Sequence, residues 1–177
     1  EVYKTVKSIK LLFQIRNMIK ITTINKSRWK DYKKLRLEAL TNDPITFGSS
    51  VNDEKKLTKK DWETRIMSSI TDTLFAIDDN ENLAGMIVAL YEKKETQKHI
   101  ARIVSFYVSP YFRRQKIGKS LFQKILTKIK QKKGIKKIKI QLYKNNLTAL
   151  KMYKKFGFKK VGILNKEIKI KGRYYDD

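Results

Sequence analysis

The hydrophobic period of the chain changes near residue 73, and this change limits the folds that the sequence can adopt. Before it, apolar residues recur at roughly helical spacing over 27–41 and 58–69. After it, the stretches TLFAIDD (73–79) and LAGMIVALYEK (83–93) are rich in β-forming residues and flank the turn residues 80–82, which predicts a hairpin. The sequence therefore combines helices with strands that are neighbours along the chain.

The remaining segments continue this mixture of strands and helices. We expect strands over 19–24, 99–110, 136–142 and 158–164, helices over 117–132 and 146–156, and one more strand, cut short, in the tail 167–177. The order β-α-α-β-β-β-α-β-α-β is typical of one α/β domain. It predicts a mixed central sheet of about six to seven strands flanked by about four helices.

Length and composition set further limits. We divide the chain into an N-terminal extension of uncertain origin, 1–17, and one domain, 18–177, and leave open whether this domain has its last strand. No stretch approaches about 18 consecutive apolar residues, so no membrane span is predicted. The chain has no cysteine, which fits a cytoplasmic protein and removes thiolate chemistry. Because the chain has a single histidine, His99, we expect no metal site. Whether the protein forms a homodimer stays open.

Basic side chains are concentrated in the last part of the chain. Residues 1–109 carry 20 basic and 14 acidic side chains, whereas 110–177 carry 22 basic and 3 acidic ones. Such an excess attracts a polyanion, either a nucleic acid or a phosphorylated cofactor. The lysine excess, 34 of the 42 basic residues, also fits the codon bias of an AT-rich genome, so charge alone does not decide the function.

The stretch VSPYFRRQKIGKSLFQKIL (108–126) places basic residues before an amphipathic helix. The first amides of a helix have no intrahelical partner, and the helix dipole adds partial positive charge at this end. Gly118 lets the backbone approach an anion without a Cβ in the way. The sequence alone leaves open whether this is a basic surface turn or a pyrophosphate cradle formed around Arg113, Arg114, Lys116 and Lys119.

With its strand–turn–helix order, this stretch resembles the cofactor loop of the GNAT acetyltransferase superfamily. That loop follows the pattern Arg/Gln-x-x-Gly-x-Gly/Ala after a strand that ends in Val-x-Pro. Val108, Pro110, Arg113 and Gly118 match the pattern, but Lys116 replaces its first glycine. A lysine there either strains the turn or adds a phosphate contact.

A second stretch, NNLTALKMYKKFGF (145–158), resembles the family segment Asn-x-x-Ala-x-x-Leu/Met-Tyr-x-x-x-Gly-Phe. The resemblance implies that Tyr153 lies near the cofactor sulfur and protonates the leaving thiolate. It implies that Asn146 helps to hold the pantetheine arm or the diphosphate. A half-buried core aromatic is the alternative interpretation of Tyr153, and the flanking Gly157-Phe158 favours the catalytic one.

The resemblance implies an N-acetyltransferase that moves an acetyl group from acetyl-CoA to a primary amine, on a small molecule or a protein, by direct attack. It implies that the fourth strand splays from the fifth and binds the pantetheine through its backbone. The predicted catalytic residue is Tyr153, and the predicted cofactor-binding residues are Phe106, Tyr107, Val108, Arg113, Arg114, Gln115, Lys116, Ile117, Gly118, Lys119, Ser120 and Asn146.

The general base has no clear candidate in the sequence. Gln141 stands where a glutamate commonly serves in ribosomal-protein N-terminal acetyltransferases, and an amide cannot act as a base. Glu38 and His99 are the next candidates, and neither is assigned. A basic enzyme repels polyamines at long range, which slightly favours an acidic or neutral acceptor.

Two other functions stay open. One is a basic nucleic-acid- or ribosome-binding module, although the shortage of arginine argues against bidentate base contacts. The other is a GNAT domain that binds acetyl-CoA with little or no turnover, suggested by Lys116 and the missing base.

Overall fold

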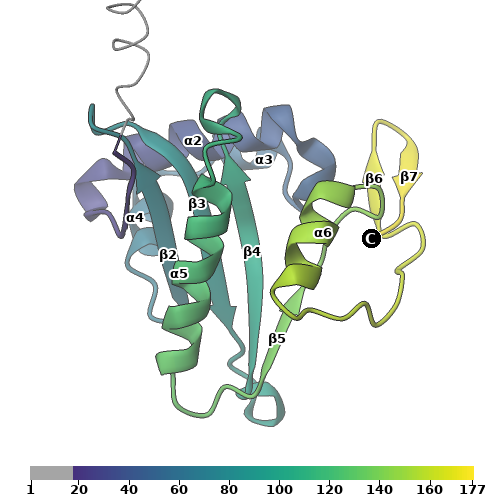
Figure 1. Ribbon diagram of the computed structural model, residues 1–177. Coiled ribbons are helices and arrows are strands. Elements are labelled where there is room, and N and C mark those ends of the chain that lie inside the picture. The colour runs from purple at the N-terminus through teal and green to yellow at the C-terminus, as the bar shows by residue number, and fades with distance from the viewer. Residues whose placement is uncertain (1–17) are drawn as a thin grey trace, which may run out of the picture.

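A five-stranded sheet forms the centre of the structure, a computed structural model that describes residues 18–177 (Figure 1). The predicted extension 1–17 lies outside the described residues. The strands follow one another in sequence order across the sheet: β1 (Lys20–Thr22), β2 (Thr71–Ile77), β3 (Leu83–Tyr91), β4 (Ile100–Val108) and β5 (Lys137–Ile140). Neighbours are antiparallel except for β4 and β5, which are parallel. The sheet is therefore mixed, as predicted.

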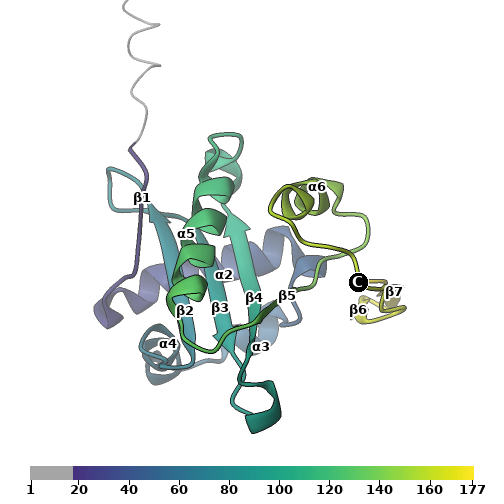
Figure 2. The same ribbon diagram turned by 60° about the horizontal axis from the view of Figure 1, so that its bottom comes forward.

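Helix α5 (Ile117–Gln131) covers one face of this sheet (Figure 2). Its apolar side chains recur every three to four residues, so they form one stripe that packs on the strands. The stripe consists of Ile117, Leu121, Phe122, Ile125 and Ile129, all buried. Helix α6 (Leu147–Lys155) adds Tyr153 to the same core.

Helices α2 (Trp29–Asn42) and α4 (Lys59–Ile66) cover the opposite face over β2 and β3. The Tyr32 ring packs edge-on against the rings of Trp62 and Phe75, with centroids 5.2 and 5.1 Å away. Edge-to-face packing is a favourable arrangement of aromatic rings. Thr58 caps α4 through a capping box that it shares with Asp61. Short elements connect these layers: η1 (Lys26–Arg28), η2 (Pro44–Thr46), α3 (Val51–Lys55), η3 (Glu95–Gln97) and η4 (Pro110–Phe112).

The predicted fold class is confirmed, with one strand placed wrongly. In the described residues seven strands and five α-helices form one α/β domain, but only five strands belong to the central sheet. Residues 158–164, predicted as a strand, have no regular structure, and Val161 is 99% exposed. A strand needs hydrogen bonds to a neighbouring strand along its length. In this segment only Leu164 forms backbone hydrogen bonds with a distant part of the described chain, and its partner is Asp177.

The predicted strand in the tail is present as a small hairpin. Strands β6 (Ile168–Ile170) and β7 (Arg173–Tyr175) pair with each other and form a separate two-stranded sheet. Lys171 and Gly172 connect them, both with positive φ, as a two-residue hairpin turn of this handedness requires. The hairpin lies close to η2. Lys144, in the loop after β5, donates a hydrogen bond to the carboxylate of Asp176, which follows β7. Within residues 18–177 no helix is long and apolar enough to cross a membrane.

Candidate active site

Strands β4 and β5 separate part-way along their length (Figure 1). Their parallel register runs from Ile100 opposite Lys137 to Ile103 opposite Ile140 and ends there. Strand β4 continues to Val108, so its last five residues have β3 on one side and no strand partner on the other. Unpaired strand backbone can bind an extended ligand as an added strand.

A β-bulge lies at the start of this unpaired segment. Met86 faces Tyr107 and Val88 faces Val104, so two β4 residues oppose one residue of β3. Ser105 takes up the extra length with φ of 54°. The predicted cofactor residues follow it and alternate: Phe106 and Val108 face α5, and Tyr107 faces α2. A ligand bound along this strand on the α5 side therefore meets the backbone of all three residues but only the side chains of Phe106 and Val108.

The unpaired end of β4 leads directly to the N-terminus of α5. The helix has no acidic residue in its first turn and no side-chain cap on its first amides. Gly118 lies over Phe106 and Val108, and a Cβ added there would lie 3.4 Å from the Phe106 ring. Of the predicted cofactor residues, this end therefore brings together Arg114, Gln115, Lys116, Ile117, Gly118, Lys119 and Ser120, of which only Ile117 is buried.

Arg113 is held apart from this group. Its Nε donates to the Val108 carbonyl oxygen at 2.9 Å, and its Nη2 bonds the Asp43 carboxylate at 2.8 Å. The guanidinium also lies over the Tyr107 ring, 5.7 Å from its centroid. In this arrangement Arg113 fixes the turn after β4 to the segment that follows α2.

Tyr153 lies in the core cluster on the α5 side of the sheet, against which Phe106 of the unpaired end of β4 also packs. Its ring packs 5.2 Å from that of Phe122 and 6.1 Å from that of Phe158. Burial raises the pKa of its hydroxyl above the ordinary value of a tyrosine, so the group stays protonated at neutral pH. Its hydroxyl makes no hydrogen bond to any residue between 18 and 177, which leaves it free to donate.

Asn146 has a local structural role. Its Oδ1 accepts a hydrogen bond from the Ala149 amide at 3.1 Å and so caps α6. The side-chain nitrogen is the part of Asn146 that can reach a ligand. The cap fixes where α6 begins, and hence where Tyr153 lies two turns later.

Comparison with known proteins identifies the family of the chain. The sequence matches the Acetyltransferase (GNAT) family over residues 29–158. The chain belongs to the GNAT acetyltransferase family. Acetyl-CoA-dependent N-acetylation is general for GNAT proteins, so membership supports an acyltransferase. A comparison with curated protein sequences found no match.

Solved structures share the GNAT fold at low sequence identity. A GNAT acetyltransferase from Streptococcus pneumoniae has a TM-score of 0.79 and 18% identity, with 90% of this chain and 95% of that chain covered. A ribosomal-protein-alanine N-acetyltransferase from Brucella melitensis has a TM-score of 0.75 and 16% identity, covering 89% and 94%. NAA60 from Arabidopsis thaliana, in complex with acetyl-CoA, has a TM-score of 0.69 and 15% identity, covering 90% and 94%. At these identities the likeness shows the fold.

The backbone explains why the GNAT loop pattern has glycine where this chain has Lys116. Lys116 immediately precedes α5 with φ of 63° and ψ of 5°, in the left-handed region. An L-residue with a Cβ adopts this region at a cost of roughly 1–2 kcal/mol. Of the two alternatives for Lys116, the strained turn is thus present in the structure. The lysine side chain is exposed, and its contact with a phosphate stays a prediction.

Lys116→Gly is expected to raise the free energy of unfolding by about 0.5–1 kcal/mol, because glycine relieves the left-handed strain but adds backbone entropy to the unfolded state. Urea denaturation measures the difference. Lys124→Gly in the middle of α5 is the matched control and is expected to lower stability by about 1 kcal/mol. A loss of stability in Lys116→Gly equal to that of the control would contradict the strain.

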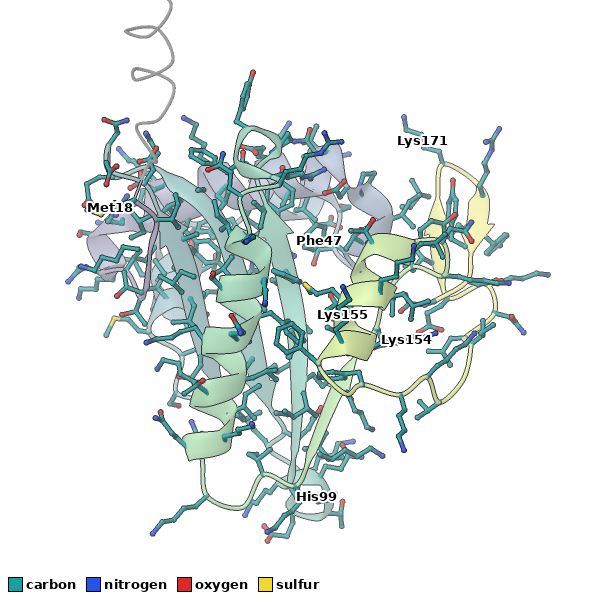
Figure 3. The ribbon with its side chains drawn as sticks, viewed as in Figure 1. Met18, Phe47, His99, Lys154, Lys155 and Lys171 are labelled. Carbon is teal, nitrogen blue, oxygen red and sulfur yellow. The ribbon has the colours of Figure 1, made fainter. Side chains whose placement is uncertain are left out.

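The base candidates fall into three different places. The Glu38 Oε1 accepts hydrogen bonds from the hydroxyls of Tyr107 and Ser109. Gln141 is exposed at the end of β5. His99 precedes β4 at the end of the sheet far from the α5 N-terminus (Figure 3), about 20 Å along the strand from Ser105. His99 is therefore too distant to take a proton where β4 and β5 separate.

The Tyr107 hydroxyl forms a network at the α2 face. It donates to Glu38 at 2.9 Å and accepts from the Asn42 side-chain amide at 2.9 Å. Burial, with Glu38 adding to it, raises the pKa of Tyr107 to about 12, although Asn42 and Arg113 act in the opposite direction. Tyr107 thus stays neutral and ties α2 to the unpaired end of β4.

A buried ion pair supports the bulge, and sequence reasoning missed it. Arg36 and Glu54 are 6% and 3% exposed and lie 2.8 Å apart. Arg65 approaches the other Glu54 oxygen at 3.0 Å, and Arg36 donates to the Ser105 hydroxyl at 3.2 Å. The signal that could have revealed it is a charged residue within the apolar stripe of α2, between Leu35 and Ala39.

The site consists of a strand edge and a helix end. Two surface hollows, of about 590 and 190 Å³, lie elsewhere. The first is lined by residues of α4 and its flanks, and the second by Tyr143–Asn145 and Tyr174–Asp176, so neither contains a predicted site residue. Among residues 18–177 no three His, Cys, Asp or Glu side chains gather closely enough to hold a metal ion.

Proposed function

We propose that this protein transfers an acetyl group from acetyl-CoA to the nitrogen of a primary amine, with both substrates bound at once. The observation that carries the proposal is the unpaired edge of β4, which ends at the uncapped, basic N-terminus of α5. The pantetheine arm of coenzyme A is an extended chain with amide groups, which suits a strand edge, and it is joined to a diphosphate, which suits a helix N-terminus. The residues present therefore fit the co-substrate.

The two ends of the site fix the direction of the bound co-substrate. Phosphates at Gly118 and Lys119 put the thioester at the opposite end of the edge, near Ser105, where β4 leaves β5. Backbone amides at a bulge point away from the ladder and can donate to the thioester carbonyl oxygen. In this proposal the reacting carbon lies beside the bulge.

The chemistry requires one acid and proximity. The neutral amine nitrogen forms a bond to the carbonyl carbon, the C–S bond breaks, and the leaving thiolate takes the proton of the Tyr153 hydroxyl. The nitrogen loses a proton to solvent, from which Tyr153 is reprotonated. Tyr153 suits the role because it is protonated at neutral pH and its hydroxyl is unengaged.

Acetyl-CoA at about 100 times its dissociation constant is expected to stabilise the protein by about 2.7 kcal/mol, which raises Tm by about 5–10 °C in a domain of this size. Thermal unfolding with and without acetyl-CoA measures it. Lys119→Glu at the helix end should reduce the shift, whereas the matched Lys130→Glu at the far end of α5 should not. No shift at millimolar acetyl-CoA, together with salt-sensitive RNA binding, would instead support the nucleic-acid module.

A further inference from the structure

One face of the β4–β5 pair carries basic side chains and no covering helix. Ile103 and Ile140 pack into the core under α5, so their strand neighbours Arg102 and Lys139 point to the opposite face. Arg102 and Lys139 lie opposite each other in the β4–β5 register, and Lys137 lies two residues before Lys139 on the same face. All three are exposed, and Val104, the next β4 residue on this face, is 38% exposed. Helices α2 and α4 therefore stop short of this part of the sheet.

The acceptor has to approach from this face if the proposed function holds. On the α5 side the region next to β4 is filled by aromatic rings, with Phe122 5.9 Å from Phe106, 4.9 Å from Phe156 and 5.7 Å from Phe158. Tyr153 packs on the same ring. An amine that attacks a thioester near Ser105 consequently has its own substituents over the opposite face, where Val104 and the basic residues lie.

Two of the three basic side chains on this face have no acidic partner among residues 18–177. Arg102 is paired with Glu92 at 2.6 Å. Across residues 18–177 neither Lys137 nor Lys139 takes part in a salt bridge. The two ammonium groups lie on alternate positions of one strand, about 7 Å apart along it, so an anion can approach both.

We propose that the acetyl acceptor carries an anionic group about 7–10 Å from its reacting nitrogen, which Lys139 binds, with Lys137 next to it on the side away from Ser105. Arg102 lies three residues before Ser105 on β4, about 10 Å along the strand, and Lys139 lies opposite Arg102 on β5. An extended peptide covers about 3.3–3.6 Å per residue, so an acidic side chain at its second or third residue reaches this point. A small ω-amino acid with a carboxylate at that distance has the same chemistry.

Matched acceptors test the charge preference. With acetyl-CoA saturating, kcat/KM is compared for short peptides with Asp or Asn at positions 2 and 3, and for 6-aminohexanoate and its amide. Two exposed charge contacts predict a preference of about 3- to 10-fold for the acids, which shrinks as salt rises. A preference within the peptide pair alone identifies a polypeptide acceptor, and one within the small-molecule pair alone identifies a free amino acid.

Charge reversal on the strand locates the effect. Lys139→Glu is expected to abolish or reverse the preference for the acids, whereas Lys130→Glu on α5 leaves it as in the wild type. Both variants are also tested for stabilisation by acetyl-CoA and for thioester consumption. Transfer without a preference, or a preference that Lys139→Glu does not alter, overturns this inference and leaves the proposed function standing. Absence of acetyl-CoA stabilisation in the wild type overturns both.

Discussion

Tyr153→Phe is expected to lower kcat for acetyl transfer about 10²- to 10⁴-fold, the range in which a positioned general acid contributes. Phenylalanine keeps the ring that packs on Phe122 and Phe158 and removes only the hydroxyl. Because this hydroxyl has no hydrogen-bond partner in the described residues, its removal should alter the free energy of unfolding by less than about 1 kcal/mol. Thioester consumption over a panel of amines, with urea denaturation alongside, separates the two effects.

The control for this variant is an exposed tyrosine that is not among the predicted site residues. Tyr174 on β7 is 55% exposed, and Tyr174→Phe is expected to keep kcat within a factor of about two. Acetyl-CoA stabilisation should be the same in wild type and Tyr153→Phe, because the acid acts on the leaving thiolate and not on binding. A Tyr153→Phe enzyme as active as the wild type would show that this tyrosine only packs. A wild type that binds acetyl-CoA but consumes no thioester would be a GNAT domain without turnover.

The sequence predicts the elements whose own pattern is strong. The apolar stripe of α5 and the β-rich hairpin of β2 and β3 are amphipathic or buried over many residues, and their bounds agree to within a few positions. Residues 158–164 show the limit of this approach. Val161 and Ile163 favour a strand locally, but strand formation depends on a partner elsewhere in the chain, and local sequence does not contain that information.

The candidate site likewise has parts that local sequence predicts and parts that depend on residues distant in sequence. The motif around Gly118 and the one around Tyr153 are local in sequence, and both lie at the separation of β4 and β5. The position of the Arg113 side chain depends on Asp43, seventy residues earlier, so spacing within the loop could not predict it. The bulge at Ser105 depends on the pairing with β3 and on Arg36, which are likewise distant in sequence.

Arg36→Met is expected to lower the free energy of unfolding by about 3–5 kcal/mol, the cost of leaving one partner of a buried ion pair uncompensated. The Glu54 carboxylate would remain 3% exposed, with Arg65 as its remaining charged partner. Lys34→Met on the exposed side of α2 is the matched control and should stay within about 0.5 kcal/mol of the wild type. Chemical denaturation measures both. The double variant Arg36→Met/Glu54→Leu should recover much of the loss, because both charges are then absent.

The pH dependence distinguishes a lost charge pair from a lost packing contact. Burial alone raises the pKa of the Glu54 carboxyl, but hydrogen bonds and charge from Arg36 and Arg65 outweigh it, and the pKa lies below its ordinary value. A depressed pKa contributes stability that is present above the unfolded-state pKa and is lost as pH falls through the folded-state pKa. Without Arg36 that contribution is small, so the stability difference between wild type and Arg36→Met should narrow on acidification. A difference that stays constant with pH would mean that Arg36 acts through packing on Phe47 alone, where its guanidinium lies 4.8 Å from the ring centroid.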